Sequence, residues 1–291
     1  MVILNPVAGK GKVQKTYQII KSELEKRGIT SAYELSSKKG EIKRLSFKCV
    51  ERGYERVIIC GGDGTVHEVM QGLVNTDVVL GIIPLGTGND LGRTLGIKKD
   101  IPFACSVIEK GQEKRIDVAR VNGDNFFAGV GAMGFDSEVA ALAEQFKSFA
   151  PGILIYILAI LAKLLTYKFK RLKLRFNDEE YNGEVLLAAF GNSRFYGGGI
   201  KITPQAKIDD GILDLCVIKR LSKLKLLFFL PTVYKGNHIH FPEVNLYRAK
   251  KIAVESDTLL NLYGDGEFVS HTPLSIEVIP QALKVIVPSR N

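Results

Sequence analysis

Three glycine-rich loops, each directly after a short apolar run, constrain the fold of this chain more than any other feature. The apolar runs cover residues 2–4, 56–60 and 78–83, and a weaker one covers 31–35. Apolar residues at helical spacing lie between the runs. This alternation of strand and helix predicts a parallel sheet covered by helices on both faces. In such sheets ligands bind at the carboxyl ends of the strands, which is where the loops lie.

The pattern changes after residue 115, where most of the predicted elements are strands. Strands are expected at 115–121, 125–130, 168–176, 185–190, 213–218, 250–255 and 283–287. Apolar helices are expected at 137–149, 153–165 and 223–233. The predicted fold is α/β, with an N-terminal Rossmann-like domain on a parallel sheet and a C-terminal, mostly antiparallel β-sandwich domain. We expect the first domain at residues 1–118, with 281–291 returning to it, and the second at 119–280.

The glycine loops themselves point to phosphate binding. They read Asn5-Pro6-Val7-Ala8-Gly9-Lys10, Gly61-Gly62-Asp63-Gly64-Thr65 and Pro84-Leu85-Gly86-Thr87-Gly88-Asn89-Asp90. Between a strand and a helix N-terminus, glycine lets phosphate reach bare backbone N–H groups and the positive end of the helix dipole. One such loop also fits a tight turn, whereas three after successive strands favour a nucleotide. None matches the Walker A or the dinucleotide G-x-G-x-x-G sequence.

Two of these loops carry an aspartate, Asp63 and Asp90. Because a carboxylate repels a bare phosphate, each would need a metal ion or a hydrogen-bonded sugar or hydroxyl nearby. The alternative is an Asx turn or a helix N-cap, which are common roles of aspartate. For Asp90 both interpretations stay open. For Asp63, which has a glycine on each side, we favour a functional role.

Several of these motifs resemble those of one known family. The second loop, with His67-Glu68 after it, resembles the nucleotide motif of the diacylglycerol kinase catalytic domain family. Residues 84–93 resemble the second motif of its lipid-kinase branch, which the more distant NAD kinases lack in this form. The first loop is similar to the first phosphate loop of the family. The resemblance covers nearly the whole chain.

The resemblance implies a site for ATP and Mg²⁺ at this edge of the sheet. The residues implied to bind the nucleotide are Asn5, Pro6, Val7, Ala8, Gly9, Lys10, Ser36, Gly61, Gly62, Asp63, Gly64, Thr65, Val66, His67, Glu68, Thr87 and Arg93. Asp63 and Asp90 are implied to orient the nucleotide and its catalytic Mg²⁺. Lys10 and Arg93 are implied to supply positive charge to the transferred phosphoryl group.

The second domain adds a motif for proton transfer. Tyr263-Gly264-Asp265-Gly266-Glu267 resembles the D-G-E segment whose glutamate is the general base of soluble bacterial diacylglycerol kinases. This implies that Glu267 takes the proton from the acceptor hydroxyl, with Asp265 as a further catalytic residue. On the residues alone, Asp-Gly also fits a plain hairpin turn.

A second motif of this domain implies a metal. Lys207-Ile208-Asp209-Asp210-Gly211-Ile212 resembles the loop that holds a structural Mg²⁺ in the family. The resemblance implies Asp210 as the side-chain ligand, with Asp209 as the alternative, and the carbonyls of Lys207 and Ile212 as further ligands. Oxygen ligands of this kind suit Mg²⁺. A turn at Asp-Asp-Gly is the alternative here as well.

The predicted function is ATP-dependent phosphorylation of a lipid hydroxyl, first of all of diacylglycerol to phosphatidic acid. The alternatives are another lipid alcohol (a sphingoid base, phosphatidylglycerol or a polyprenol), a soluble substrate as in NAD kinases, and a nucleotide-binding regulator without turnover. The lipid-type motif at 86–93 and the apolar helices argue against the soluble substrate. Intact Asp63, Asp90 and Glu267 argue against the regulator.

We expect a cytoplasmic protein that binds reversibly to the inner membrane surface. No signal peptide is evident, because residues 2–4 lead straight into the turn at Asn5-Pro6. The longest apolar stretch, 151–165, is shorter than the roughly 20 residues that a membrane span needs. The net charge of +9 and the predicted helix 153–165, followed by basic residues, would favour an anionic bilayer. ATP and a lipid are the expected partners, nucleic acid is not, and a homodimer is left open.

Overall fold

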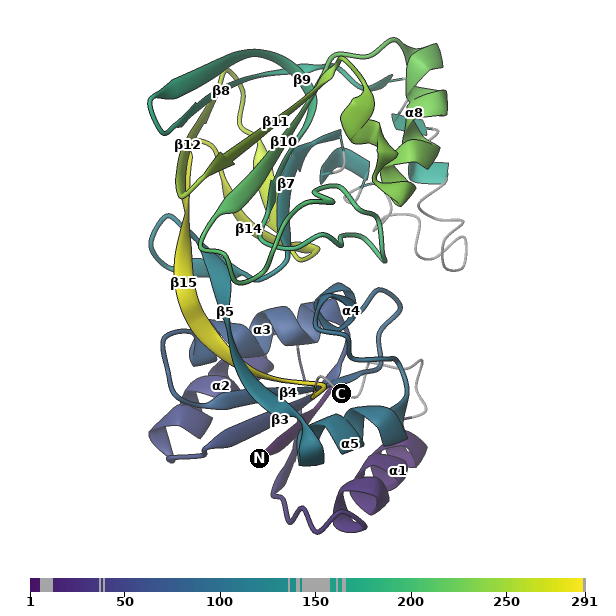
Figure 1. Cartoon of the computed structure of the whole chain (residues 1–291), viewed down its shortest axis with the longest axis vertical. Helices are drawn as coiled ribbons and strands as arrows, with labels where there is room; N and C mark the ends of the chain where they lie inside the picture. Colours follow the sequence, from purple (N-terminus) through teal and green to yellow (C-terminus); the bar gives the residue numbers. More distant parts are fainter. Residues whose placement is uncertain are drawn as a thin grey trace.

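The computed structural model describes residues 1–5, 13–36, 38, 40–135, 137–139, 142, 158–160, 162–163 and 166–289. The chain is elongated, with an α/β domain at one end and a β-rich domain at the other (Figure 1). Pro6, Val7, Ala8, Gly9 and Lys10 of the first loop lie outside the described residues. Most residues of the predicted helices 137–149 and 153–165 also lie outside the described residues.

The first domain has a parallel sheet with helices on both faces, which confirms the predicted fold class. Its strands are β1 (Val2–Leu4), β2 (Tyr33–Leu35), β3 (Arg56–Gly61) and β4 (Val79–Pro84), in the order β4-β3-β1-β2. Its helices are α1 (Val13–Glu25), α2 (Glu41–Glu51), α3 (Asp63–Leu73), α4 (Asp90–Thr94) and α5 (Ile101–Lys110). Helices α2 and α3 pack together on one face of the sheet, and α1 and α5 on the other (Figure 1).

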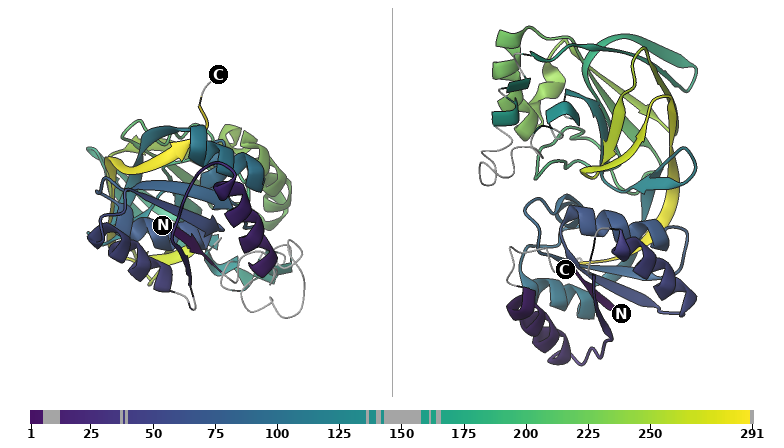
Figure 2. Two further views of the ribbon diagram at one scale, coloured as in Figure 1. Left: turned by 90° about the horizontal axis from the view of Figure 1, so that it is seen from below. Right: turned by 180° about the vertical axis from the view of Figure 1, so that it is seen from behind.

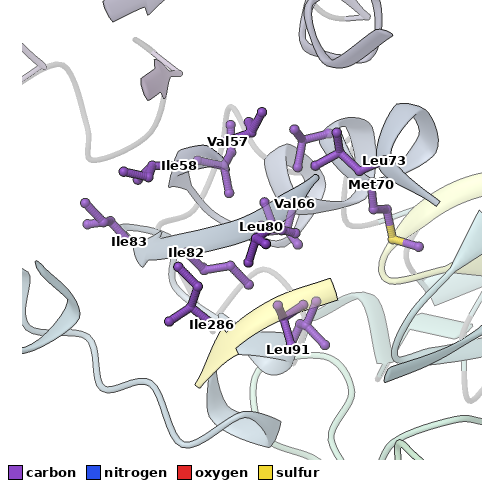
Figure 3. Close-up of a cluster of buried hydrophobic side chains, with 14 of the residues drawn as sticks. Val57, Ile58, Val66, Met70, Leu73, Leu80, Ile82, Ile83, Leu91 and Ile286 are labelled. Atoms are coloured by element: carbon purple, nitrogen blue, oxygen red, sulfur yellow. The ribbon is translucent and has the colours of Figure 1, made fainter. Parts of the chain in front are cut away.

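The central strands β3 and β4 are buried on both faces. All residues of β4, and all but the first of β3, are buried, so both strands are continuous apolar runs rather than alternating ones. Val57 and Leu80 share one core with Val66 and Met70 of α3 (Figure 3). Tight packing on both faces fixes these strands, and their carboxyl ends therefore hold the second and third glycine loops in defined positions.

The second domain is mostly antiparallel and sandwich-like. Its strands are β6 (Asn125–Phe127), β7 (Val130–Gly134), β8 (Lys170–Phe176), β9 (Glu179–Gly191), β10 (Leu213–Lys219), β11 (Val244–Ala249), β12 (Lys251–Ser256), β13 (Asn261–Gly264) and β14 (Glu267–His271). Along β8, buried Leu172, Leu174 and Phe176 alternate with more exposed residues, as expected for a sheet with one solvated face. Helix α8 (Lys223–Lys235) and a 3₁₀ helix (Asn237–His240) follow β10.

Two long strands, β5 (Gln112–Val121) and β15 (Leu274–Val287), join the domains (Figures 1 and 2). They pair with each other antiparallel, with a shift of register after Ile279. The first half of β15 contributes to the core of the second domain, whereas Ile286 near its end packs into the core of the first (Figure 3). The end of β15 also pairs in parallel with β4. The tail thus returns to the first sheet, while the exact domain boundaries stay a prediction.

Parts of the second domain differ from the prediction. The strand expected at 125–130 is two strands, β6 and β7, because the chain turns at residues 128–129. Strand β9 begins at Glu179 instead of 185, because its first half is polar and lies largely in solvent. Strands β11, β13 and β14 were not predicted; they are short, and polar residues or glycine interrupt their apolar positions.

The four cysteines are buried and free, as expected for small apolar side chains. Burial raises the pKa of the Cys105 thiol to about 11 and that of Cys216 to about 12, so neither forms a thiolate near neutral pH. In the part of the chain that the structure describes, no helix is both long enough and apolar enough to cross a bilayer.

Candidate active site

The second and third glycine loops pack directly against each other at the carboxyl edge of the first sheet. A Cβ atom at Gly86 would lie 2.5 Å from the Cα of Gly62, a distance that real side chains do not adopt. A Cβ at Gly62 would in turn lie 3.0 Å from the Cα of Gly86. The backbones can therefore approach this closely only because both residues are glycine. The two loops form one unit.

Asp63 joins the two loops through its carboxylate. It is the first residue of α3, and its Oδ2 and Oδ1 accept the backbone N–H groups of Asn89 and Asp90 at 2.7 and 2.6 Å. A Cβ at Gly88 would lie 2.6 Å from Asp63 Oδ2, so glycine is required there as well. Burial raises the pKa of Asp63, although the two hydrogen bonds oppose the rise. The structure therefore gives Asp63 the role of a cap at the start of α4.

Asp90 contacts the second domain. Its Oδ2 accepts the backbone N–H of Gly198 at 2.8 Å. Its Oδ1 is buried and has no hydrogen-bond partner among the described residues; the nearest cation is Arg93 Nε at 4.0 Å. Burial, and then the charge of Asp63, raise the pKa of Asp90 to about 6. An unsatisfied, buried carboxylate oxygen at a glycine loop is suited to hold a cation or a ligand hydroxyl.

Glu267 brings a second-domain carboxylate to the same place. It begins β14, directly after the Asp265-Gly266 turn of the β13–β14 hairpin. Its Oε1 lies so close to Gly64 that a Cβ there would be only 2.7 Å away. Gly64 belongs to the first turn of α3, where free backbone N–H groups and the helix dipole attract phosphate. A carboxylate therefore lies beside a predicted phosphate site, as proton abstraction next to phosphoryl transfer requires.

Asp265 holds this hairpin in position. The residue has a left-handed backbone conformation, with φ 54°. Its carboxylate accepts N–H groups from Ala128, Gly129 and Val130 at 2.8, 2.8 and 3.3 Å. His67 Nδ1 of α3 lies 3.8 Å from the same carboxylate. These contacts attach the turn that precedes Glu267 to the β6–β7 connection. The catalytic role expected for Asp265 stays a prediction.

The other described residues of the expected nucleotide site lie around these loops. Asn5 Nδ2 donates to Thr65 Oγ1 at 2.9 Å, which ties the first strand to the second loop. Glu68 Oε2 accepts the N–H of Gly40 at 3.0 Å. Ser36 is buried after β2, while Thr87 and Arg93 are exposed. The structure thus brings the described members of the predicted set to one edge of the sheet, together with Gly61 at the end of β3 and Val66 in α3.

The expected structural metal loop lies beside β5 and β11. Asp209 Oδ2 pairs with Lys114 at 2.7 Å, and Asp210 pairs with Arg248. Asp210 Oδ1 also accepts the N–H of Ile212 at 3.3 Å. The described residues include no group of three or more acidic, histidine or cysteine side chains placed for a metal. A site of one carboxylate and the carbonyls of Lys207 and Ile212 would have to compete with Arg248, and it stays a prediction.

Three further residues that contribute to the site were not predicted from the sequence. Gly198 belongs to three consecutive glycines at 197–199, all with positive φ, and it is the partner of Asp90. Asn192 Nδ2 donates to the carbonyls of Asp117 and Ala128, both at 2.8 Å. Asp117 is buried and accepts the N–H groups of Gly211 and Gln281 at 2.6 and 2.8 Å. The usable signals were the glycine triplet and a lone aspartate within an apolar strand.

Comparison with known proteins agrees with this arrangement. Residues 1–121 match the model of the diacylglycerol kinase catalytic domain, and residues 129–287 match the YegS C-terminal NAD kinase beta sandwich-like domain. A Mycobacterium tuberculosis protein named diacylglycerol kinase is 36% identical over an alignment that covers 98% of this chain and 94% of the relative. A Staphylococcus saprophyticus protein of the same name is 30% identical, over 99% of this chain and 95% of the relative.

Solved structures agree as well. A Bacillus anthracis structure assigned to the diacylglycerol kinases is 29% identical with a TM-score of 0.82, covering 98% of this chain and 94% of that chain. An Archaeoglobus fulgidus NAD kinase, solved in complex with ATP, is 14% identical with a TM-score of 0.55, over 98% and 92% of the two chains; this likeness shows the fold alone. The chain belongs to the diacylglycerol kinase catalytic domain family and is a phosphotransferase with an alcohol acceptor.

Proposed function

We propose that this protein is an ATP-dependent lipid kinase that transfers the γ-phosphate of ATP to the hydroxyl of diacylglycerol, forming phosphatidic acid. The observation that carries the proposal is the position of Glu267, whose Oε1 lies against Gly64 at the start of α3. A general base from one domain and a phosphate loop from the other meet there. This is the arrangement that an attacking hydroxyl and a transferred phosphoryl group need.

The nucleotide would lie across the glycine loops. Backbone N–H groups of residues 62–64 would bind its phosphates at the positive end of α3, since those of Thr65 and Val66 already donate to the carbonyl of Gly62. The exposed guanidinium of Arg93 would add positive charge beside the phosphoryl group. The exposed side chain of Thr87 and the residues of the first loop, Asn5 to Lys10, complete the proposed set.

Asp90 is suited to hold the Mg²⁺ that accompanies the nucleotide. Its Oδ1 is a buried oxygen without a hydrogen-bond partner among the described residues, and carboxylate oxygen is the ligand that Mg²⁺ prefers. When bound, Mg²⁺ would neutralise charge on the phosphate oxygens. Asp63 acts differently, because both of its oxygens already accept backbone N–H groups. Its proposed part is to keep the third loop, and with it Asp90, in position.

Glu267 would take the proton from the lipid hydroxyl as the hydroxyl oxygen attacks the γ-phosphorus. Asp265 would support this step by fixing the hairpin turn through three backbone N–H groups. The bond from the γ-phosphorus to the bridging oxygen breaks, and ADP leaves with the electron pair. The lipid headgroup would enter between the domains, near the contact of Gly198 with Asp90.

Relatives that match the chain over nearly its whole length bear the name diacylglycerol kinase, which supports that lipid as the first substrate to test. Because the substrate lies in a bilayer, we propose that the protein docks reversibly on the cytoplasmic membrane surface. Sphingoid bases, phosphatidylglycerol and polyprenols are the alternative acceptors.

A lipid panel tests the proposal. The purified chain is incubated with γ-labelled ATP, Mg²⁺ and each lipid alcohol in mixed micelles, with NAD as the soluble alternative. We expect label in phosphatidic acid, and none when Mg²⁺ is chelated. Label only in NADP would overturn the proposal, as would ATP binding without transfer to any acceptor.

A further inference from the structure

Helix α8 carries large apolar residues on its outer as well as its inner side, although it lies at the surface of the second domain (Figure 1). Its inner residues Leu226, Phe229 and Val233 are buried in the core formed with β9 and β10. A helix with only one covered face normally carries polar residues on the other. In α8 large apolar residues occupy exposed positions beside the lysines, which suits a helix with an apolar environment on both sides.

The outer residues form one continuous stripe, which we call the α8 outer face. It consists of Leu224, Phe228, Pro231 and Tyr234, spaced at four, three and three residues, so they share one side of the helix. Leu224 is 68% exposed, Phe228 70% and Tyr234 58%. These are among the most exposed large apolar side chains that the structure describes, and no described residue covers them.

The chain segment that contains this face carries charges of one sign only. The sequence from residue 215 to residue 242 contains five lysines and arginines and no aspartate or glutamate. Arg220 and Lys225 have acidic partners, Glu184 and Glu243, that lie outside this segment. An apolar helix face within a basic segment complements an anionic lipid surface, where the apolar side chains enter the headgroup region and the cations meet the phosphates.

The α8 outer face is also connected to the active site. Helix α8 ends at Gly236, where a Cβ would lie 3.0 Å from Pro204 Cβ and 3.4 Å from Lys201 Cβ. The segment 198–204 therefore packs under the end of α8, and the same segment reaches Asp90 through Gly198. A surface bound to the outer face would thus lie next to a segment that contacts the candidate active site. In the view from behind, α8 lies on the outside of the second domain (Figure 2, right).

We propose that the α8 outer face inserts into the interfacial region of an anionic bilayer and holds the candidate active site at the membrane surface. This docking role rests on the proposed lipid-kinase function, because that function makes a lipid bilayer the partner. Unlike the charge-driven docking expected around residues 153–165, it assigns insertion to named side chains of α8. A second copy of the chain, or another segment of the same chain, is the competing occupant of this face.

The absence of tryptophan from the sequence permits a site-specific test. Phe228→Trp places the only indole of the chain on the outer face. With vesicles containing phosphatidylglycerol, we expect its emission to shift to the blue and to be quenched by brominated acyl chains. Leu259→Trp is the matched control, because Leu259 is equally exposed, at 69%, on the β12–β13 connection. Its emission should change little.

Three outcomes would overturn the inference. Vesicle binding without a change at position 228 would assign docking to another surface. A blue shift that grows with protein concentration in the absence of vesicles would assign the face to a second copy. Emission that is already blue in dilute, vesicle-free protein and insensitive to lipid would mean that the chain covers the face itself.

A second variant separates docking from catalysis. Phe228→Ser should weaken binding to anionic vesicles by roughly 10- to 100-fold, the effect of losing one inserted aromatic side chain. Turnover of a short-chain diacylglycerol dissolved as monomers should stay at the wild-type level. Wild-type vesicle affinity in Phe228→Ser would refute the docking role. Absence of turnover with every lipid in the wild type would instead refute the proposed function and leave the vesicle result standing.

Discussion

The carboxylate of Asp63 accepts the backbone N–H of Asp90 at 2.6 Å, so two acidic residues from successive glycine loops are held side by side. The same carboxylate accepts the N–H of Asn89 at 2.7 Å. These bonds attach the start of α4 to the start of α3. The side chain of Asp63 is therefore a structural cap within the site.

Asp63→Ala should therefore lower stability as well as activity. Two buried N–H groups would lose their acceptor, which should cost about 1–3 kcal/mol, or roughly 2–4 °C in Tm for each kcal/mol. Thermal unfolding monitored by circular dichroism measures this. Asp100→Ala is the control, because Asp100 caps α5 through Phe103 N at 2.7 Å and lies outside the site. It should lose stability but keep turnover. An unchanged Tm in Asp63→Ala would contradict the capping role.

Asp90 should make stability depend on pH. Burial raises its pKa from 3.8 to about 6, so the folded protein binds more protons than the unfolded chain between these values. The free energy of unfolding should therefore fall as pH rises through that window. Above the window the contribution of this group no longer changes with pH. Asp90→Asn cannot ionise, yet it can still accept the N–H of Gly198.

We expect Asp90→Asn to exceed the wild type in free energy of unfolding at pH 8 by on the order of 1 kcal/mol, since solvent partly screens the group. The difference should become small near pH 4, close to the unfolded pKa of 3.8, because the carboxyl is then largely protonated in both states. Urea unfolding at both pH values checks this. An equal stability difference at both pH values would mean that ionisation of Asp90 is not the cause of the difference.

Gly64→Ala tests how the second-domain carboxylate reaches the phosphate loop. The new Cβ would lie 2.7 Å from Glu267 Oε1, and the flexible glutamate would move aside at little cost in stability. Because a displacement of about 1 Å in a reacting group can cost 10²-fold in rate, we expect turnover to fall by about that factor. Initial rates with saturating ATP measure the effect.

Two comparisons separate displacement of Glu267 from other effects. Gly92→Ala is the matched control, because a Cβ at Gly92 in α4 would make only ordinary contacts, the nearest at 3.7 Å. It should retain turnover. In a Glu267→Gln background the further loss caused by Gly64→Ala should be much smaller, since the base is already absent. A loss of the same factor in both backgrounds would show that Gly64→Ala acts through the nucleotide instead.

The sequence predicted the first domain and its loops well, because parallel strands buried on both faces are visible as apolar runs. The carboxyl ends of such strands must share one edge, so Asp63 and Asp90 could be expected near each other. The hydrogen-bond partners of these two carboxylates could not be predicted. The contact of Asp90 with Gly198 joins residues 108 positions apart, and no local pattern specifies such a contact.

The second domain was harder to predict. The pair Asp265-Gly266 is a hairpin turn, as its composition alone suggested. The flanking strands β13 and β14 are too short to show an apolar alternation. That Asp265 binds the backbone near Gly129, 136 positions away, depends on tertiary packing. Strand β15 likewise serves two cores in turn, which a local pattern cannot reveal.

The central claim is that Glu267 is the general base for phosphoryl transfer to a lipid hydroxyl, and Glu267→Gln tests it most directly. The variant keeps the size of the side chain and removes its basicity. Label transfer from ATP to diacylglycerol should fall by about 10²- to 10⁴-fold, while ATP affinity and Tm stay at wild-type values. Transfer at a rate near that of the wild type would contradict the account.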